Sequence, residues 1–293
     1  MTAFLGCIAD DYTGASDIAS QLAEQGVKTV QLFGVPDMDI DIAPDTQVII
    51  IGLKTRTQKV DDAIKESLGA LLYLKHKGCA RFYFKYCSTF DSTPLGNIGP
   101  VADALAAELN SNSVIFCPAF PKNGRTVYMG HLFVNGVLLN ESSLATHPLT
   151  PMTDANLVRW LSQQTKMEVG LLDCEALDNG LETCRSKVEE LSSLGYQGVI
   201  VDTINSNHLN ILGELCSDYK LVSGGSALAP ALVSAWRKQG LLPSNSKTQI
   251  VKPHLKGHAV ILSGSCSDKS NHQVNVWRSQ GGVAYFLDPK QLM

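Results

Sequence analysis

The sequence lacks several features that would place the protein among common functional classes. It has no apolar run of about 18 residues, so we expect no membrane span and no membrane partner. Its first residues show neither the basic start nor the small-residue cleavage site of a secretory signal, which predicts a cytoplasmic protein. The formal net charge of -4 argues against a nucleic-acid partner, because such proteins usually present a basic face.

Metal and nucleotide signatures are also missing. The eight cysteines are scattered singly and form no C-x-x-C pair, so we predict reduced thiols and no zinc site. No residues are assigned as ligands of a resident metal. The G-x-x-x-x-G-K pattern of a Walker A loop is absent, so any phosphate contact must come from a different kind of loop.

What is present is an alternation of short apolar runs with segments of helical period. The runs at 4–9, 47–53 and 114–117 predict buried strands, and 60–77 and 98–109 predict helices. Continuous apolar strands that alternate with helices are typical of an α/β fold with a mostly parallel sheet flanked by helices. One segment, 126–139, departs from this rhythm: it predicts an inserted β-hairpin that turns at Asn135-Gly136.

The chain of 293 residues is long enough for one large domain or two medium ones. Periodicity is lost after about position 240, in a segment with prolines, serines and lysines. A new β-α-β pattern then begins, with strands predicted at 259–262 and 283–287. We therefore assign residues 1–240 to a first domain, 241–257 to a linker and 258–293 to the start of a second α/β domain.

Polar residues follow several of the predicted strands, where an open α/β sheet binds its ligands. Asp10, Asp11 and Thr13 come directly after the first strand. Paired carboxylates at such a place can accept a proton from a hydroxyl or hold a divalent cation. The alternative is that one of them simply caps the next helix, and the sequence does not decide which aspartate would act as a base.

Two further strand ends carry cations and hydroxyl groups. These residues suit a small hydroxylated anion, because hydroxyls need donors and acceptors while a carboxylate needs a cation. A polar turn and solvated surface cations are the alternative interpretation. The candidate residues are Lys54, Arg56, Lys85, Ser88, Thr89, Asp91, Ser92 and, after a later strand, Arg125.

Two turns between a predicted strand and a helix are rich in glycine or serine. Such turns can direct backbone N–H groups at an anion near a helix N-terminus, although many glycine turns bind nothing. We select these turns as candidate nucleotide contacts: Gly224 and Gly225 in the first, and Ser263, Gly264, Ser265 and Ser267 in the second.

Six longer segments carry a resemblance to a known family, the four-carbon acid sugar kinases. The resemblance spans almost the whole chain, and its motifs are long and specific. The segments are IADDYTGASDIA, KYCSTFDSTPLGNIGPV, CPAFPKNGRTVYMGHLFV, HPLTPMTDANLVR, VSGGSAL and LSGSCS.

The resemblance implies a two-domain α/β enzyme that uses ATP and Mg²⁺ in carbohydrate metabolism. Its first domain would hold the sugar acid, and its second domain, which LSGSCS opens, would bind ATP. The implied reaction moves the γ-phosphoryl group of ATP to the terminal C4 hydroxyl of a 3-oxo-tetronate and yields the 4-phosphate. Asp11, or else Asp10, would take the hydroxyl proton, and Lys85 and Arg125 would fix the substrate carboxylate.

The family pattern continues past position 293 and includes a further glycine-rich loop that contacts ATP. We therefore expect this chain to carry a sugar-acid pocket but only part of an ATP site.

Alternatives stay open within and outside the kinase class. The substrate could instead be threonate, erythronate or 4-hydroxythreonine. The chain could also be a non-catalytic protein that binds a sugar acid, and whether it forms a homodimer is left open. An Asp-x-Asp phosphatase is disfavoured, because the adjacent Asp10 and Asp11 point in different directions at a strand end.

Overall fold

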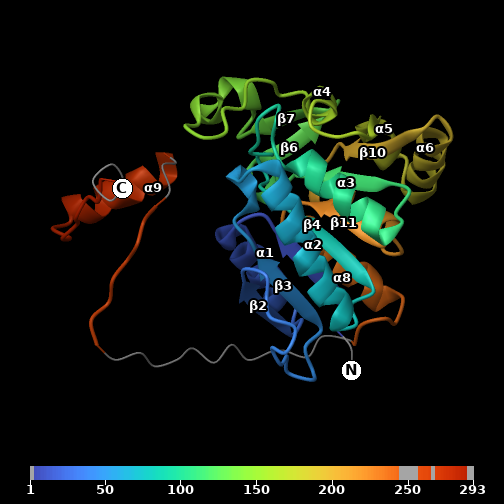
Figure 1. Ribbon diagram of the computed structural model, residues 1–293. Coiled ribbons are helices and arrows are strands. Elements are labelled where there is room, and N and C mark those ends of the chain that lie inside the picture. The colour runs from blue at the N-terminus through green and yellow to red at the C-terminus, as the bar shows by residue number, and fades with distance from the viewer. Residues whose placement is uncertain (1–2, 244–256, 265–267, 289–293) are drawn as a thin grey trace. The chain divides into compact units, whose positions relative to one another are not determined.

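The computed structural model describes residues 3–243, 257–264 and 268–288. The chain divides into two compact units, Met1–Thr248 and Gln249–Met293 (Figure 1). The predicted domain limits at 240 and 257 stay a prediction.

An eight-stranded parallel sheet forms the centre of the first unit. The strand order is β2-β3-β1-β4-β11-β5-β10-β9. In this order β1 lies between β3 and β4, so the loops that follow these three strands are neighbours. The strands are β1 (Leu5–Ala9), β2 (Thr29–Phe33), β3 (Val48–Gly52), β4 (Arg81–Lys85), β5 (Val114–Cys117), β9 (Glu168–Leu172), β10 (Tyr196–Val201) and β11 (Leu221–Gly224).

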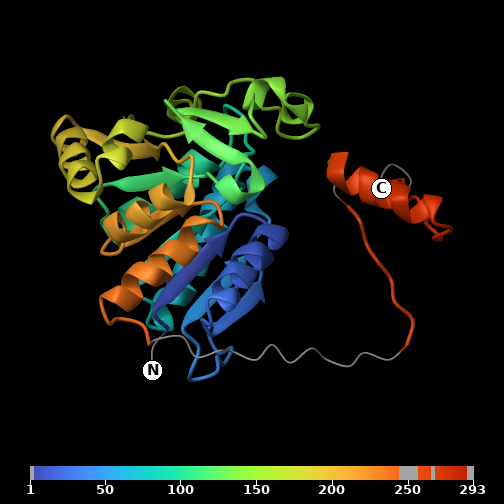
Figure 2. The ribbon, with the colours of Figure 1, turned by 180° about the vertical axis from the view of Figure 1, so that it is seen from behind.

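Helices cover both faces of the sheet. On one face α2 (Val60–His76) packs against α3 (Ile98–Leu109), as Figure 1 shows. On the other face α8 (Leu228–Lys238) packs against both α1 (Tyr12–Glu24) and α7 (Ser206–Leu215), and α1 and α8 are in front in Figure 2. Three further helices lie near β9 and β10: α4 (Leu157–Ser162), α5 (Cys174–Asp178) and α6 (Leu181–Ser193).

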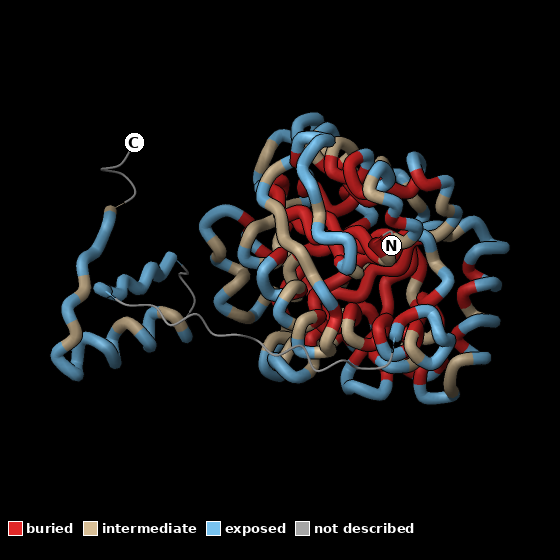
Figure 3. The backbone as a smooth tube through the Cα atoms, turned by 90° about the horizontal axis from the view of Figure 1, so that it is seen from below, coloured by how far each residue is buried: buried red, intermediate tan, exposed pale blue. Residues whose placement is uncertain are grey.

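The core lies between the sheet and these helices. Every residue of β1, β3 and β5 is buried, and the tube in Figure 3 shows the buried segments gathered at the centre of the first unit. Strands that are covered on both faces lose water on both sides, which is why their sequences are continuous apolar runs. The predicted α/β class with a mainly parallel sheet is confirmed.

The predicted hairpin is part of a three-stranded antiparallel sheet. Its strands are β6 (Arg125–Tyr128), β7 (His131–Val134) and β8 (Val137–Leu138). The turn at Asn135-Gly136 occurs as expected, with both residues at positive φ. A second turn, at Met129-Gly130, was not predicted, because methionine rarely adopts the left-handed conformation that it has here (φ 49°).

A buried carboxylate fixes that second turn to the main sheet. Asp202, directly after β10, is fully buried and accepts hydrogen bonds from Met129 N (2.7 Å), Gly130 N (2.8 Å) and Cys174 N (3.0 Å). Three backbone donors satisfy the charge that burial would otherwise leave unsolvated. Four short 3₁₀ turns complete the unit: η1 (Thr55–Thr57), η2 (Pro121–Asn123), η3 (Leu139–Glu141) and η4 (Ser143–Thr146).

The described part of the second unit contains one helix, α9 (Asp268–Ser279). The strands predicted at 259–262 and 283–287 are not formed among the described residues. Their apolar side chains are exposed instead, with Val260 at 80% and Tyr285 at 89%. A strand needs a neighbour for its backbone hydrogen bonds, and apolar sequence alone does not supply one.

Within the described residues, no helix is long and apolar enough to cross a membrane. The seven cysteines of this part are free thiols; Cys87 is partly exposed and the other six are buried.

Candidate functional site

Three loops meet at the carboxyl edge of the sheet, where β3, β1 and β4 end side by side. The loop after β1 carries Asp10 and Asp11, the turn η1 after β3 carries Arg56, and the loop after β4 carries Asp91. Ligands of open α/β sheets bind beyond this edge, at the point where the connections diverge to opposite faces. The structure thus brings together residues that lie up to 81 positions apart in the sequence.

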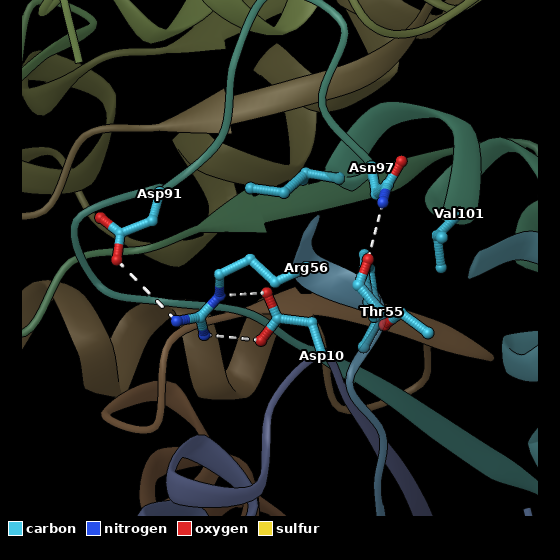
Figure 4. A pocket seen from close by; sticks show the side chains of 8 residues that line it. Asp10, Thr55, Arg56, Asp91, Asn97 and Val101 are labelled. Atoms are coloured by element: carbon cyan, nitrogen blue, oxygen red, sulfur yellow. Dashed lines mark hydrogen bonds and ion pairs between the residues drawn. The ribbon is translucent and has the colours of Figure 1, made fainter. Parts of the chain in front are cut away.

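Asp10 and Arg56 form a paired centre in this edge (Figure 4). Arg56 Nε donates to Asp10 Oδ2 and Arg56 Nη2 donates to Asp10 Oδ1, both at 2.8 Å. Asp10 is buried, and burial raises the pKa of its carboxyl while the Arg56 charge acts in the opposite direction. Burial disfavours the guanidinium cation too, but the facing Asp10 carboxylate gives Arg56 a net raised pKa. Asp10 is therefore fixed by two parallel hydrogen bonds rather than open to a ligand.

Asp11 has a different environment from its neighbour. Its Oδ1 accepts from Gly14 N (3.0 Å), which caps α1, and from Arg56 Nη2 (2.7 Å). Its side chain is 28% exposed, and no described residue donates a hydrogen bond to Oδ2. Asp11 thus caps α1 with one carboxylate oxygen and leaves the other oxygen without a partner among the described residues. Of the two aspartates, it is the one with an oxygen free to meet a substrate.

Lys85, the last residue of β4, is buried beside Asp11. Its Nζ donates to Tyr86 O (2.8 Å), which leaves two of its three ammonium hydrogens without a partner among the described residues. Gly14 keeps the space between these groups open. A Cβ atom on Gly14 would lie 2.3 Å from Asp11 Oδ1 and 2.9 Å from Lys85 Nζ. The neighbouring Thr13 is exposed.

The loop after β4 arranges its own side chains in a chain of contacts. Cys87 Sγ lies 2.8 Å from Thr89 Oγ1, and Thr89 Oγ1 donates to Asp91 Oδ1 (2.6 Å). Asp91 Oδ2 in turn lies 3.9 Å from Arg56 Nη1, the contact drawn in Figure 4. Burial and the Asp91 charge raise the pKa of the Cys87 thiol to about 11, so the thiol is neutral at physiological pH. Ser88, between Cys87 and Thr89 in the sequence, is partly exposed.

Asn97 holds the turn that carries Arg56, and sequence reasoning missed it. Its Nδ2 donates to Thr55 O (2.6 Å) and to Gln58 O (2.9 Å), which are the two ends of that turn. Figure 4 shows Asn97 above Thr55. Asn97 Oδ1 and Thr55 Oγ1 are buried without a hydrogen-bond partner among the described residues. No local pattern marks Asn97, because its partners lie about 40 positions away.

Three predicted contact residues lie outside this paired centre. Ser92 is buried, and its hydroxyl is engaged inside the protein. Lys54 is exposed, with Nζ 5.1 Å from the centre of the Tyr12 ring, beside a hollow of about 340 Å³. Arg125 begins β6 and donates from Nη1 to Asn123 O, while its Nε is buried without a hydrogen-bond partner among the described residues. The predicted contact of Arg125 with a substrate carboxylate stays a prediction.

The predicted nucleotide contacts Gly224 and Gly225 are buried at a close approach of two backbones. A Cβ on Gly224 would come within 2.4 Å of Cys117 O, and one on Gly225 within 2.6 Å of Pro118 O. Packing alone therefore accounts for glycine at both positions. Their predicted contact with a nucleotide stays a prediction.

In the second unit, Ser263 and Gly264 lie in exposed chain without regular secondary structure. The predicted contacts Ser265 and Ser267 lie outside the described residues. No group of three or more His, Cys, Asp or Glu side chains that suits a metal ion occurs in the described ranges.

Comparison with known proteins identifies the family. A family model described as a sugar-binding N-terminal domain matches residues 5–232. A protein of Cupriavidus necator named 3-oxo-tetronate kinase is 47% identical over 289 residues, which is 98% of this chain and 67% of the relative. This chain belongs to the four-carbon acid sugar kinase family.

Solved structures of relatives share this architecture. A protein of Salmonella typhimurium LT2, described as a putative tRNA synthase, is 44% identical with a TM-score of 0.85, over 95% of this chain and 65% of its own. A Bordetella bronchiseptica domain of unknown function, crystallised with citrate as a domain-swapped dimer, is 26% identical. Its TM-score is 0.65, over 80% of this chain and 58% of its own. The chain spans about two thirds of the length of the curated relatives that it matches.

Proposed function

We propose that the first unit binds a four-carbon sugar acid, most specifically 3-oxo-tetronate, for ATP-dependent phosphorylation at its terminal C4 hydroxyl. The observation that carries the proposal is the contrast between the two aspartates. Asp10 is held by Arg56, whereas Asp11 keeps an open oxygen beside the buried Lys85 ammonium. The names of the curated relatives, which are 3-oxo-tetronate kinases, support this choice of substrate.

Different residues suit the two ends of the substrate because of their charge. The carboxylate end needs cationic donors, which Lys85 and the orphaned Nε of Arg125 offer. The hydroxyl end needs an acceptor, which Asp11 Oδ2 offers. Asp91 offers an acceptor for a middle hydroxyl of the acid, and Thr89, which donates a hydrogen bond to Asp91, would hold that carboxylate in place. Ser88 and Thr13, in the same loops, would add further hydroxyl contacts.

Asp11 acts as the base in the proposed step. As the C4 oxygen forms its bond to the γ-phosphorus, its proton passes to the Asp11 carboxylate and the bond from γ-phosphorus to the bridging oxygen breaks. Arg56 donates to Asp11 Oδ1, so it holds the carboxylate in one orientation. ATP, when bound, would supply the phosphoryl group, and Mg²⁺ would neutralise the charge on its phosphates.

The protein groups in this site suit a magnesium ion that arrives with the nucleotide. Mg²⁺ is usually held by one or two carboxylates together with substrate phosphates and water. Asp91 is a carboxylate of that kind, and it is partly exposed.

Replacement of Asp11 by Asn tests the assignment of the base. The change keeps the size of the side chain and an acceptor oxygen for the Gly14 cap, but it removes the negative charge. In an assay of 3-oxo-tetronate-dependent ADP release, we expect turnover to fall at least about 100-fold, the usual contribution of a general base. The dissociation constant for the sugar acid, measured by isothermal titration calorimetry, should stay within about threefold. Unchanged turnover in Asp11→Asn would rule out this role.

A second candidate function is binding of the sugar acid without phosphoryl transfer. It is favoured by the position of Asp11, Lys85 and Asp91, which all lie in the first unit. Calorimetric titration separates the two functions: heat with the sugar acid but none with ATP supports the binding protein. A panel with threonate, erythronate and 4-hydroxythreonine in the same assay identifies the preferred acid.

A further inference from the structure

Phe90, in the middle of the loop after β4, has a left-handed backbone. Its φ is 57°, and its ring is fully buried at 5.2 Å from the Tyr86 ring in an edge-to-face contact. This conformation is unfavourable for a bulky residue, by about 1–3 kcal/mol, and persists only where the surroundings impose it. Of the residues on either side of it, Thr89 donates a hydrogen bond to Asp91, and Asp91 lies 3.9 Å from Arg56.

A buried hydrogen-bond network imposes this conformation. Ser92 Oγ donates to Phe90 O (2.8 Å) and accepts from Trp160 Nε1 (3.0 Å) and Gln164 Nε2 (3.0 Å). The single donor and both acceptor positions of the hydroxyl are therefore used. Trp160 lies in α4 and Gln164 follows that helix, so residues about 70 positions away hold the carbonyl of Phe90.

The consequence appears on the other side of the loop. With the Phe90 carbonyl fixed inward, Thr89 and Asp91 stay joined by their 2.6 Å hydrogen bond, and Asp91 stays 3.9 Å from Arg56. We propose that Trp160, Gln164 and Ser92 are positioning residues that lock the left-handed turn at Phe90 and thereby pre-organise Thr89 and Asp91 for the sugar acid. The binding half of this inference rests on the proposed function.

The structure provides a matched control for the indole. Trp236, in α8, is also buried and also donates from Nε1 to an oxygen, Ser217 O at 2.8 Å. Neither Trp236 nor Ser217 belongs to the loops of the site. Trp160→Phe and Trp236→Phe thus remove the same kind of buried hydrogen bond, and only the first removes it from the network under Phe90.

The test compares these two variants by stability and by binding. We expect similar decreases in melting temperature, because each substitution removes one indole N–H that donates to a buried oxygen. For Trp160→Phe the dissociation constant for 3-oxo-tetronate should rise about tenfold, as expected when a contact loop loses its pre-organisation. For Trp236→Phe it should stay within about twofold. When wild type binds the acid, equal binding by both variants, or equal weakening in both, overturns the proposal.

A second readout needs no sugar acid. Cys87 Sγ contacts Thr89 Oγ1 at 2.8 Å, so loosening of the turn exposes this thiol. Iodoacetamide labelling, quantified at Cys87 by mass spectrometry, should be several-fold faster in Trp160→Phe than in wild type or Trp236→Phe. Ser92→Ala, which removes the hydroxyl itself, must give the same acceleration and replaces Trp160→Phe if that variant does not fold.

The two readouts separate the two ideas. If wild type binds no sugar acid but Cys87 is labelled faster in Trp160→Phe and Ser92→Ala than in wild type, the positioning network is right and the proposed function is wrong. If wild type binds the acid but the labelling rate is unchanged in both variants, the proposed function is right and the positioning network is wrong.

Discussion

Asp10 and Asp11 are neighbours in the sequence, and the fold gives them different tasks. Asp10 closes a buried pair with Arg56, whereas Asp11 caps α1 with one oxygen and leaves the other open. From the sequence, a helix cap and a catalytic base are alternative interpretations of this motif. The structure shows that Asp11 is the cap, and the role as base stays a prediction. The turn that carries Arg56 lies over the loop after β1, with Arg56 N donating to Asp10 O (3.2 Å).

The Asp10–Arg56 pair leads to a stability prediction. Arg56→Met should lower the free energy of unfolding by about 3–5 kcal/mol, because it leaves the Asp10 carboxylate buried without its partner. Arg159 offers a matched control, because it also makes a bidentate contact with a carboxylate, that of Asp154. The Arg159 side chain, however, is 62% exposed. Arg159→Met should leave the free energy of unfolding nearly unchanged in the same urea titration. Equal losses in the two variants would contradict the account of the buried pair.

A buried thiol leads to a prediction about pH. Burial raises the pKa of Cys117 from the ordinary thiol value of 9.0 to about 11. Between these two values the unfolded chain releases this proton and the folded chain keeps it, so the free energy of unfolding falls as pH rises. A shift of this size corresponds to about 3 kcal/mol at the alkaline limit. Below pH 9 this thiol contributes no slope.

Cys117→Ala provides the comparison. Urea titrations from pH 8 to pH 11 should show a steeper loss of stability in wild type than in the variant. Parallel curves would mean that the thiol ionises equally well in both states.

Sequence reasoning at the residue scale reached those side chains that follow a strand directly. Asp10, Asp11, Arg56, Lys85 and Asp91 could be selected because the carboxyl ends of parallel strands share one edge. Asn97, Trp160 and Gln164 could not be selected. Their contacts with the site exist only after helices α3 and α4 pack against loops that lie about 40 to 70 positions away.

At the scale of elements, the strands of the parallel sheet were predictable because burial on both faces demands apolar residues throughout. The five-residue helix α5 was not, since a single turn shows no helical period. The turn between β6 and β7 was missed for another reason. Its conformation is imposed by Asp202, whose carboxylate binds the backbone N–H groups of Met129 and Gly130.

This turn gives a prediction of increased stability. Met129 has a positive φ, 55% of its surface is exposed, and it is followed by Gly130, so Met129→Asn creates the Asn-Gly sequence that such turns favour. Asparagine tolerates the left-handed region better than methionine, and the backbone N–H to Asp202 is kept. The free energy of unfolding should rise by about 0.5–1 kcal/mol in urea titration. A decrease would show that the Met129 side chain makes a contribution beyond its backbone.

At the scale of the whole molecule, the two units differ in how well their apolar residues are covered. The first unit encloses a continuous core, whereas Val260, Ile261, Tyr285 and Phe286 of the second are at least 80% exposed. The predicted sugar-acid site lies wholly in the first unit, and the family model matches the same part, residues 5–232. We therefore predict that sugar-acid binding is a property of the first unit.

The central claim is that a sugar acid binds beside Asp11 through the buried Lys85 ammonium, and calorimetric titration of the chain with 3-oxo-tetronate tests it most directly. Lys85→Met removes the cation from the site, while Lys75→Met removes an exposed lysine that pairs with Glu108 far from these loops. We predict one binding site per chain, with a dissociation constant that rises more than about tenfold in Lys85→Met, the loss expected for a charge-assisted hydrogen bond. Lys75→Met should bind as wild type does. Absence of binding by the wild-type chain, or equal binding by wild type and Lys85→Met, would contradict the account.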